Sequence, residues 1–189
     1  MSLEEASRRI IVRSRLKTFI QSYSCFHAPV NHAHKLESPN VEATLRVGEA
    51  IGRLAPAGLL VALNGELGSG KTHLVKGIAR GLGIPNWQSV NSPTFTLLQT
   101  HRGGRLPLHH MDFYRLTGTR EPPPELDDAL GDNAALKAVE WTECFPDVVA
   151  NASAALEIAC EHVGENMRRL TLHAGGWDAT GLWKEIAAL

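Results

Sequence analysis

The sequence predicts an α/β fold: a single domain with a central, mostly parallel sheet that includes an antiparallel hairpin and has helices on both faces. Three observations support this prediction. The continuous apolar run at 59–63 is typical of a strand that is buried on both faces of a parallel sheet. A glycine-rich loop and an amphipathic segment follow this run directly. Several further strand-like segments come later in the chain.

The other elements follow from hydrophobic spacing and from turn residues. We expect helices at 41–54, about 70–82 and 177–189. We expect strands at 59–63, 93–101, 105–113, 136–139, 154–162 and 168–173. Arg102-Gly103-Gly104 is a hairpin signal between the second and third of these strands. The segment 117–132 contains three consecutive prolines, so we expect it to be a loop with one short helix.

The chain has 189 residues, which is enough for one domain. Pro39-Asn40 marks a boundary between an N-terminal extension, 1–40, and a folded domain, 41–189. Two interpretations of the extension stay open, a poorly ordered segment or an organelle transit peptide, and Glu4 and Glu5 disfavour the second. We therefore expect a cytoplasmic protein, or one in an organelle matrix if the extension is a transit peptide.

Composition excludes several classes of protein. The 19 basic and 20 acidic residues nearly balance, so the overall charge gives no reason to expect binding to nucleic acid or to a membrane surface. No apolar run approaches the roughly 18 residues that a membrane-spanning helix needs. The three cysteines are widely spaced, which indicates neither a disulfide framework nor a zinc site and favours a reducing compartment.

The glycine-rich loop has the pattern of a phosphate-binding loop. Gly65-Glu66-Leu67-Gly68-Ser69-Gly70-Lys71-Thr72 fits Gly-x4-Gly-Lys-Ser/Thr. Glycines allow positive φ angles, which bring successive backbone N–H groups close to phosphate oxygens. The helix that follows presents its partial positive charge to the same phosphates. We expect Lys71 to reach the β- and γ-phosphates and the Thr72 hydroxyl to ligate Mg²⁺, as in a P-loop NTPase-like domain.

Such an enzyme also needs a second carboxylate for Mg²⁺ and a group that orients the attacking molecule. Asp112 ends a strand of alternating apolar residues, and Glu140 follows the short strand at 136–139. Both are therefore expected at the crevice beyond the strand ends, where nucleotides bind. The alternatives are a loop cap for Asp112 and a solvated strand end for Glu140.

Asn91-Ser92-Pro93-Thr94-Phe95 lies about twenty residues after the loop. A segment in this position could contact a γ-phosphate through Ser92 or Thr94, although taken alone it is more often a turn that leads into a strand. The nine histidines suggest no metal site, and His109 and His110 alternate along their strand, so at most one of them can face a site. We assign no catalytic role to any histidine.

Four motifs together resemble the TsaE family, the bacterial-type P-loop ATPase of tRNA threonylcarbamoyladenosine biosynthesis. In order, they are the phosphate loop, Ser92-Pro93-Thr94-Phe95-Thr96, His110-Met111-Asp112-Phe113-Tyr114-Arg115-Leu116 and Val139-Glu140-Trp141. The phosphate loop is generic, whereas the combination of the other three motifs is specific. The resemblance covers roughly 41–177.

The resemblance implies a set of site residues and partners. ATP would be contacted by residues 65–73, which end at His73, and by Trp141. Mg²⁺ would be held by Thr72 and Asp112. The catalytic residues would be Lys71, Thr94, which lies in a switch-like segment, and Glu140, which is needed for hydrolysis. TsaB-like and TsaD-like partners would attach a threonylcarbamoyl group to the adenosine next to the anticodon. The ATPase would not carry out that transfer. Its hydrolysis would reset the partner complex, and it would meet tRNA only through that complex.

The chain departs from the family in its prolines at 122–124 and in its long extension.

Three other functions are alternatives to an ATPase of tRNA modification. A small-molecule kinase would bring lid arginines over the phosphoryl group, for which Arg115 and Arg120 are the candidates. A GTP-driven switch lacks its Asn/Thr-Lys-x-Asp pattern here. A directly RNA-binding module would need a basic stripe, which the folded part lacks.

Overall fold

Seven strands form one sheet in the computed structural model, which describes residues 33–189. Their order across the sheet is β1-β7-β6-β2-β5-β4-β3. The strands are β1 (His34–Ser38), β2 (Leu60–Asn64), β3 (Leu98–His101), β4 (Leu108–Asp112), β5 (Leu136–Glu140), β6 (Ala155–His162) and β7 (Arg168–Gly175).

The strand directions confirm the predicted mixed sheet. β6, β2, β5 and β4 are parallel neighbours. β3 pairs antiparallel with β4, and β7 pairs antiparallel with β6. Because β1 pairs antiparallel with β7, it runs in the same direction as the four parallel strands, so five of the seven strands share one direction. The predicted hairpin is β3–β4, and β6–β7 forms a second hairpin. The fold is therefore α/β and P-loop NTPase-like, as expected.

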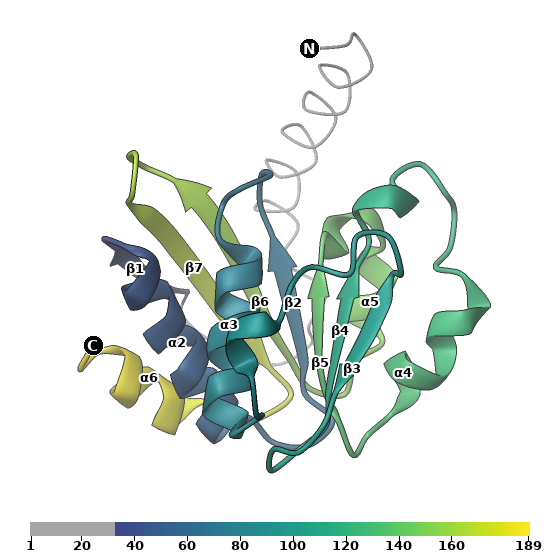
Figure 1. Ribbon diagram of the computed structural model, residues 1–189, viewed down its shortest axis with the longest axis horizontal. Coiled ribbons are helices and arrows are strands. Elements are labelled where there is room, and N and C mark those ends of the chain that lie inside the picture. The colour runs from purple at the N-terminus through teal and green to yellow at the C-terminus, as the bar shows by residue number, and fades with distance from the viewer. Residues whose placement is uncertain (1–32) are drawn as a thin grey trace, which may run out of the picture.

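Helices cover both faces of the sheet. α2 (Val41–Leu54), α3 (Lys71–Leu82) and α6 (Thr180–Ile186) share one apolar cluster with Val61 and Leu63 of β2. α4 (Asp127–Gly131) and α5 (Pro146–Ala150) share the other cluster with Leu60 and Ala62. Figure 1 shows α2 and α3 in front of the sheet, with α6 beside α2. No helix in residues 33–189 is long and apolar enough to cross a membrane.

Short 3₁₀ helices occupy several connections. They are Trp87–Ser89, Tyr114–Leu116, Pro124–Leu126 and Thr142–Cys144. The third of them leads into α4, which confirms the expected short helix within the loop at 117–132. The helix that spans 146–150 was not predicted, because five residues are too few to show a helical period.

Glycines let α2 and α3 cross at backbone contact. A Cβ atom at Gly48 would lie 2.3 Å from the carbonyl oxygen of Leu74, and one at Gly77 would lie 2.3 Å from that of Leu45. Any larger residue would push the helices apart. Because α3 begins at the end of the phosphate loop, this crossing helps to fix the loop against the sheet.

Several predicted boundaries were wrong; the strand expected from residue 105, for example, begins only at Leu108. The strand expected from residue 93 begins only at Leu98, because Leu97 N–H donates to the carbonyl of Pro93 at 2.7 Å and Leu97 adopts a φ of 63°. The helix expected at 177–189 is limited to α6, where residues 180–186 are helical. Residues 34–38, assigned to the extension, form β1 and pair with β7, for example Leu36 with Leu170. The two interpretations of the extension otherwise concern residues 1–32, outside the described residues.

Candidate functional site

The phosphate-loop motif connects β2 to α3 as predicted. β2 ends at Asn64, and Lys71 is the first residue of α3. Gly65, Gly68 and Gly70 have φ angles of 138°, 78° and 104°, which other residues rarely adopt. A Cβ atom at Gly65 would lie 2.2 Å from the carbonyl oxygen of Cys160, so the loop also packs closely on β6.

The buried hydroxyl of Ser69 has no hydrogen-bond partner among the described residues. An unpaired buried hydroxyl is costly, so it is a natural contact for a bound ligand. It lies one residue before Gly70, which caps the N-terminus of α3. The loop therefore offers an unpaired hydroxyl next to the positive end of a helix, which fits phosphate.

Lys71 is buried and points back into the loop. Its Nζ donates to the carbonyl oxygen of Gly65 at 2.7 Å and to that of Glu66 at 3.0 Å, and it lies 4.0 Å from the centre of the Trp141 ring. Burial lowers the pKa of Lys71, and the charge of Glu140 is the largest opposing influence. Two neutral carbonyls therefore solvate this ammonium group, and phosphate oxygens would be stronger partners.

Glu140 lies at the end of β5 and is 3% exposed. Its Oε1 accepts hydrogen bonds from Thr72 Oγ1 at 3.0 Å and from His110 Nε2 at 3.0 Å. Asp112 ends β4 and is the register partner of Glu140. The structure thus brings both predicted carboxylates to the carboxyl ends of adjacent parallel strands, beside the phosphate loop, and neither is a solvated residue.

Asp112 holds the segment that carries Ser92 and Thr94. Its Oδ2 accepts hydrogen bonds from Ser92 Oγ and from Thr94 Oγ1, the latter at 2.7 Å, and its Oδ1 accepts from the Tyr114 N–H at 2.9 Å. The next residue, Phe95, is 81% exposed. The predicted switch-like segment is therefore tied to the carboxylate that was predicted to ligate Mg²⁺.

Three other residues of the predicted nucleotide set lie at the periphery. Glu66 and Leu67 are exposed at the tip of the loop, where Leu67 is 67% exposed. His73 is exposed on the first turn of α3, and its pKa is lowered by partial burial and by the charges of Lys76 and Arg168. These three can contribute backbone N–H groups more readily than side chains.

Trp141 is 4% exposed and adopts a left-handed φ of 66°. Its N–H continues the sheet ladder by donating to the Leu63 carbonyl at 2.8 Å, and its ring packs on Tyr114 at a centroid distance of 5.0 Å. A non-glycine residue in this conformation stores strain, which concentrates at functional sites. The Trp141 ring contacts the phosphate loop through Lys71, whose Nζ lies over it.

Sequence reasoning missed two buried groups. His110 was not assigned a role, yet it contacts Glu140. Glu143 follows Glu140 by three residues and is 4% exposed. Its carboxylate lies near the N–H groups of Gly65 and of its own residue without reaching full hydrogen-bond geometry. Burial raises the pKa of Glu143 to about 7. Only the strand-end position of the Glu-Trp motif could have indicated this burial.

The residues present fit a hydrated Mg²⁺ ion bound with phosphate. Thr72 and Asp112 supply hard oxygen atoms, which Mg²⁺ prefers, and the ion usually keeps waters and phosphate oxygens as its other ligands. Within residues 33–189 there is no group of three or more His, Cys, Asp or Glu side chains that could hold a metal ion. A few protein oxygens beside a phosphate loop suit Mg²⁺ better than a metal that requires a complete protein cage.

Comparison with known proteins gives consistent matches. The family model described as threonylcarbamoyl adenosine biosynthesis protein TsaE matches residues 38–170. The chain is 34% identical over 142 residues to the tRNA threonylcarbamoyladenosine biosynthesis protein TsaE of Bacillus subtilis, covering 75% of this chain and 86% of that one. The protein of the same name from Synechocystis sp. is 37% identical over 113 residues, 58% of this chain and 71% of that one.

A solved structure shares the fold. The crystal structure of Bacillus subtilis YdiB matches with a TM-score of 0.64 at 26% identity, covering 85% of this chain and 98% of that chain. The family match spans the phosphate loop, the segment of Ser92 and Thr94, and both strand-end carboxylates.

Proposed function

Because the chain belongs to the TsaE family, we propose that it is the component of tRNA threonylcarbamoyladenosine biosynthesis that binds and hydrolyses ATP. In this proposal its hydrolysis resets a complex of TsaB-like and TsaD-like partners, which carry out the transfer. The chain meets tRNA only through that complex.

One observation carries the proposal: the 3.0 Å hydrogen bond from Thr72 Oγ1 to Glu140 Oε1. It joins the phosphate-loop hydroxyl to a buried carboxylate 68 residues later in the chain. A loop that only held phosphate would not need a buried carboxylate beside its metal-binding hydroxyl. An ATPase needs such a group to orient the attacking water.

Each residue of the site has its own role in the proposed hydrolysis. Lys71 exchanges the two loop carbonyls for phosphate oxygens, and the loop N–H groups bind the same phosphates. Thr72 and Asp112 would hold Mg²⁺, which neutralises phosphate charge when bound. Glu140 accepts a hydrogen bond from water and orients it towards the γ-phosphate.

The segment that contains Ser92 and Thr94 would report nucleotide state to the partners. Both hydroxyls bond Oδ2 of Asp112, so binding of a metal ion by this carboxylate competes directly with them. Release or rearrangement of these bonds would move Phe95, whose exposed ring lies 4.1 Å from the guanidinium of Arg115. Arg115 is thus engaged by the switch-like segment, which does not favour the lid role of a kinase arginine.

The test is Mg²⁺-ATP hydrolysis by the purified full-length chain, alone and with a TsaB–TsaD pair. We expect slow basal turnover that rises when the pair is added and is lost in Lys71→Ala and in Glu140→Ala. Turnover that ignores the pair would reduce the proposal to a P-loop nucleotide-binding protein. Competition binding with GTP belongs in the same series, since a clear preference for GTP would overturn the assignment of ATP.

A further inference from the structure

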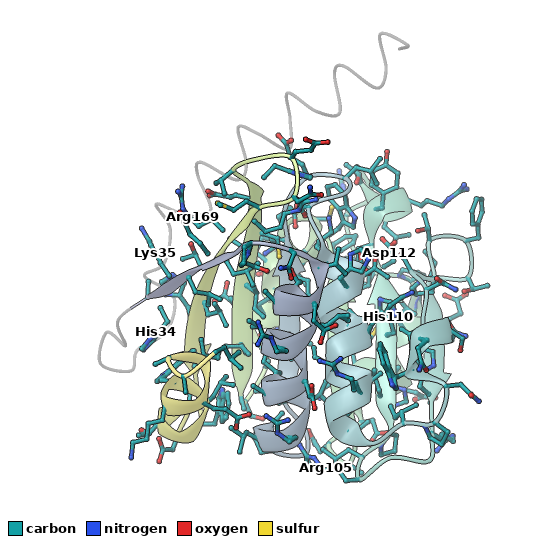
Figure 2. The ribbon with its side chains drawn as sticks, turned by 60° about the vertical axis from the view of Figure 1, so that its left-hand side comes forward. His34, Lys35, Arg105, His110, Asp112 and Arg169 are labelled. Carbon is teal, nitrogen blue, oxygen red and sulfur yellow. The ribbon has the colours of Figure 1, made fainter. Side chains whose placement is uncertain are left out.

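His110 is a completely buried polar side chain at the middle of β4, the strand next to the edge strand β3. It is 0% exposed and lies on β4, two residues before Asp112, on the same face of that strand. Figure 2 shows the two residues one above the other along the strand. Its register partner on β5 is Ala138, two residues before Glu140, so the ring lies beneath both strand-end carboxylates.

The contact between His110 and Glu140 fixes the roles of its atoms. Nε2 lies 3.0 Å from Glu140 Oε1, the oxygen that also accepts from Thr72 Oγ1, so we assign the ring proton to Nε2, which donates to this acceptor. The other ring nitrogen, Nδ1, is buried without a hydrogen-bond partner among residues 33–189. All the hydrogen bonding of this ring therefore goes to Glu140.

Two donors meet at one oxygen of Glu140. Thr72 Oγ1 and His110 Nε2 both donate to Oε1, and no hydrogen bond from the described residues ends on Oε2. Anchoring Oε1 prevents the carboxylate from turning about its last side-chain torsion and keeps Oε2 directed away from His110. An acceptor held in this way is preorganised to orient a water molecule.

We propose that His110 is a positioning residue that anchors Glu140 Oε1, so that Oε2 is held ready for the water that attacks ATP. This inference rests on the proposed function. His110 does not touch the substrate, and its effect passes entirely through Glu140. Its removal should therefore lower kcat and leave the KM for ATP nearly unchanged.

A pair of polar variants separates positioning from packing. In His110→Gln the side-chain amide nitrogen can take the place of Nε2, whereas the shorter side chain of His110→Asn places its amide near the position of Nδ1. We expect kcat of the Asn variant to fall about 10- to 100-fold, as for loss of a hydrogen bond to a charged group, and the Gln variant to keep most of its kcat. Equal kcat values for two folded variants would overturn the proposal.

His109→Asn is the matched control. This neighbouring histidine is also buried and also contacts a carboxylate, with Nε2 2.9 Å from Asp132 Oδ2, but it points to the other face of the sheet. Its substitution should leave kcat within about twofold of the wild type. A loss as large as that of His110→Asn would mean that any buried histidine of β4 matters equally, and would overturn the positioning role.

A double-mutant cycle shows whether the effect passes through Glu140. In single-turnover ATP hydrolysis, His110→Asn should have little further effect once Glu140→Gln is present. Independent, multiplying effects would refute the coupling. A failure of the proposed function can be distinguished from a failure of this inference. If the wild-type chain hydrolyses no ATP, alone or with its partners, both the proposed function and the role of His110 are refuted. If hydrolysis needs Glu140 but not His110, only the role of His110 is refuted.

Discussion

Replacing Glu143 with glutamine should stabilise the protein increasingly between pH 4.5 and about 7, and should have little effect below pH 4.5. Burial raises the pKa of Glu143 from 4.5 to about 7, because the charged form loses its hydration and gains no full hydrogen bond in exchange. Below pH 4.5 the carboxyl group is protonated in both the folded and the unfolded chain, so it adds no pH-dependent cost. As pH rises towards 7, the unfolded chain releases this proton while the folded chain still holds it, so stability falls.

The size of the effect follows from the shift. Each pKa unit corresponds to about 1.4 kcal/mol, so a shift from 4.5 to about 7 sets an upper limit of roughly 3 kcal/mol on the cost at pH 8. Glutamine has nearly the same shape and never ionises, so it avoids that cost. The nearby charge of Lys71 already favours the carboxylate and is included in the shift.

The assay is urea unfolding of wild type and Glu143→Gln at several pH values between 4.5 and 8. The difference in unfolding free energy should grow with pH to about 1–3 kcal/mol in favour of the variant. Glu125→Gln, at an exposed position, controls for the change of a carboxylate to an amide. A difference that is constant with pH, or that grows towards acid, would refute the reasoning.

The other predictions concern ATP binding, metal affinity and helix packing. Lys71→Ala should weaken ATP binding by at least about tenfold in calorimetry, because a charged hydrogen-bond donor to phosphate is lost; unchanged affinity would contradict its role. Asp112→Asn should raise the Mg²⁺ concentration for half-maximal hydrolysis about tenfold or more, and an unchanged metal titration would count against this ligand. Gly77→Ala should lower the unfolding free energy by about 1–3 kcal/mol and reduce Tm in calorimetry, because its Cβ would lie 2.3 Å from the Leu45 carbonyl. Gly181→Ala, whose Cβ would meet nothing within 4 Å, should leave Tm unchanged or slightly higher, and equal losses in the two glycine variants would refute the packing argument.

The parts of the fold that depend on local sequence could be predicted. The buried strand β2, the glycine loop and the start of α2 carry their signals in adjacent residues; for example, Asn40 Oδ1 caps α2 by accepting from the Ala43 N–H at 2.9 Å. The strand-end placement of Asp112 and Glu140 followed from the apolar residues before each of them.

The parts that depend on distant contacts could not be predicted. β1 is a strand because of its pairing with β7, at least 130 residues later, and its own five residues carry little strand signal. The turn at 93–97 interrupts good strand formers because the Ser92 and Thr94 hydroxyls bond Asp112. His110 and Glu143 acquire their environments only when β4, β5 and the phosphate loop meet. Single-strand periodicity could show that at most one of His109 and His110 faces a site, but not which group that histidine contacts.

The most direct test of the central claim is the number of tRNA molecules that a limiting TsaB–TsaD pair modifies, with ATP, in the presence of this chain or of its Glu140→Ala variant. If ATP hydrolysis resets the partner complex, the wild-type chain should support many rounds per complex, and the variant should support about one round and then stop. Equal numbers of rounds with both proteins would contradict the account, because modification would then be independent of hydrolysis at this site.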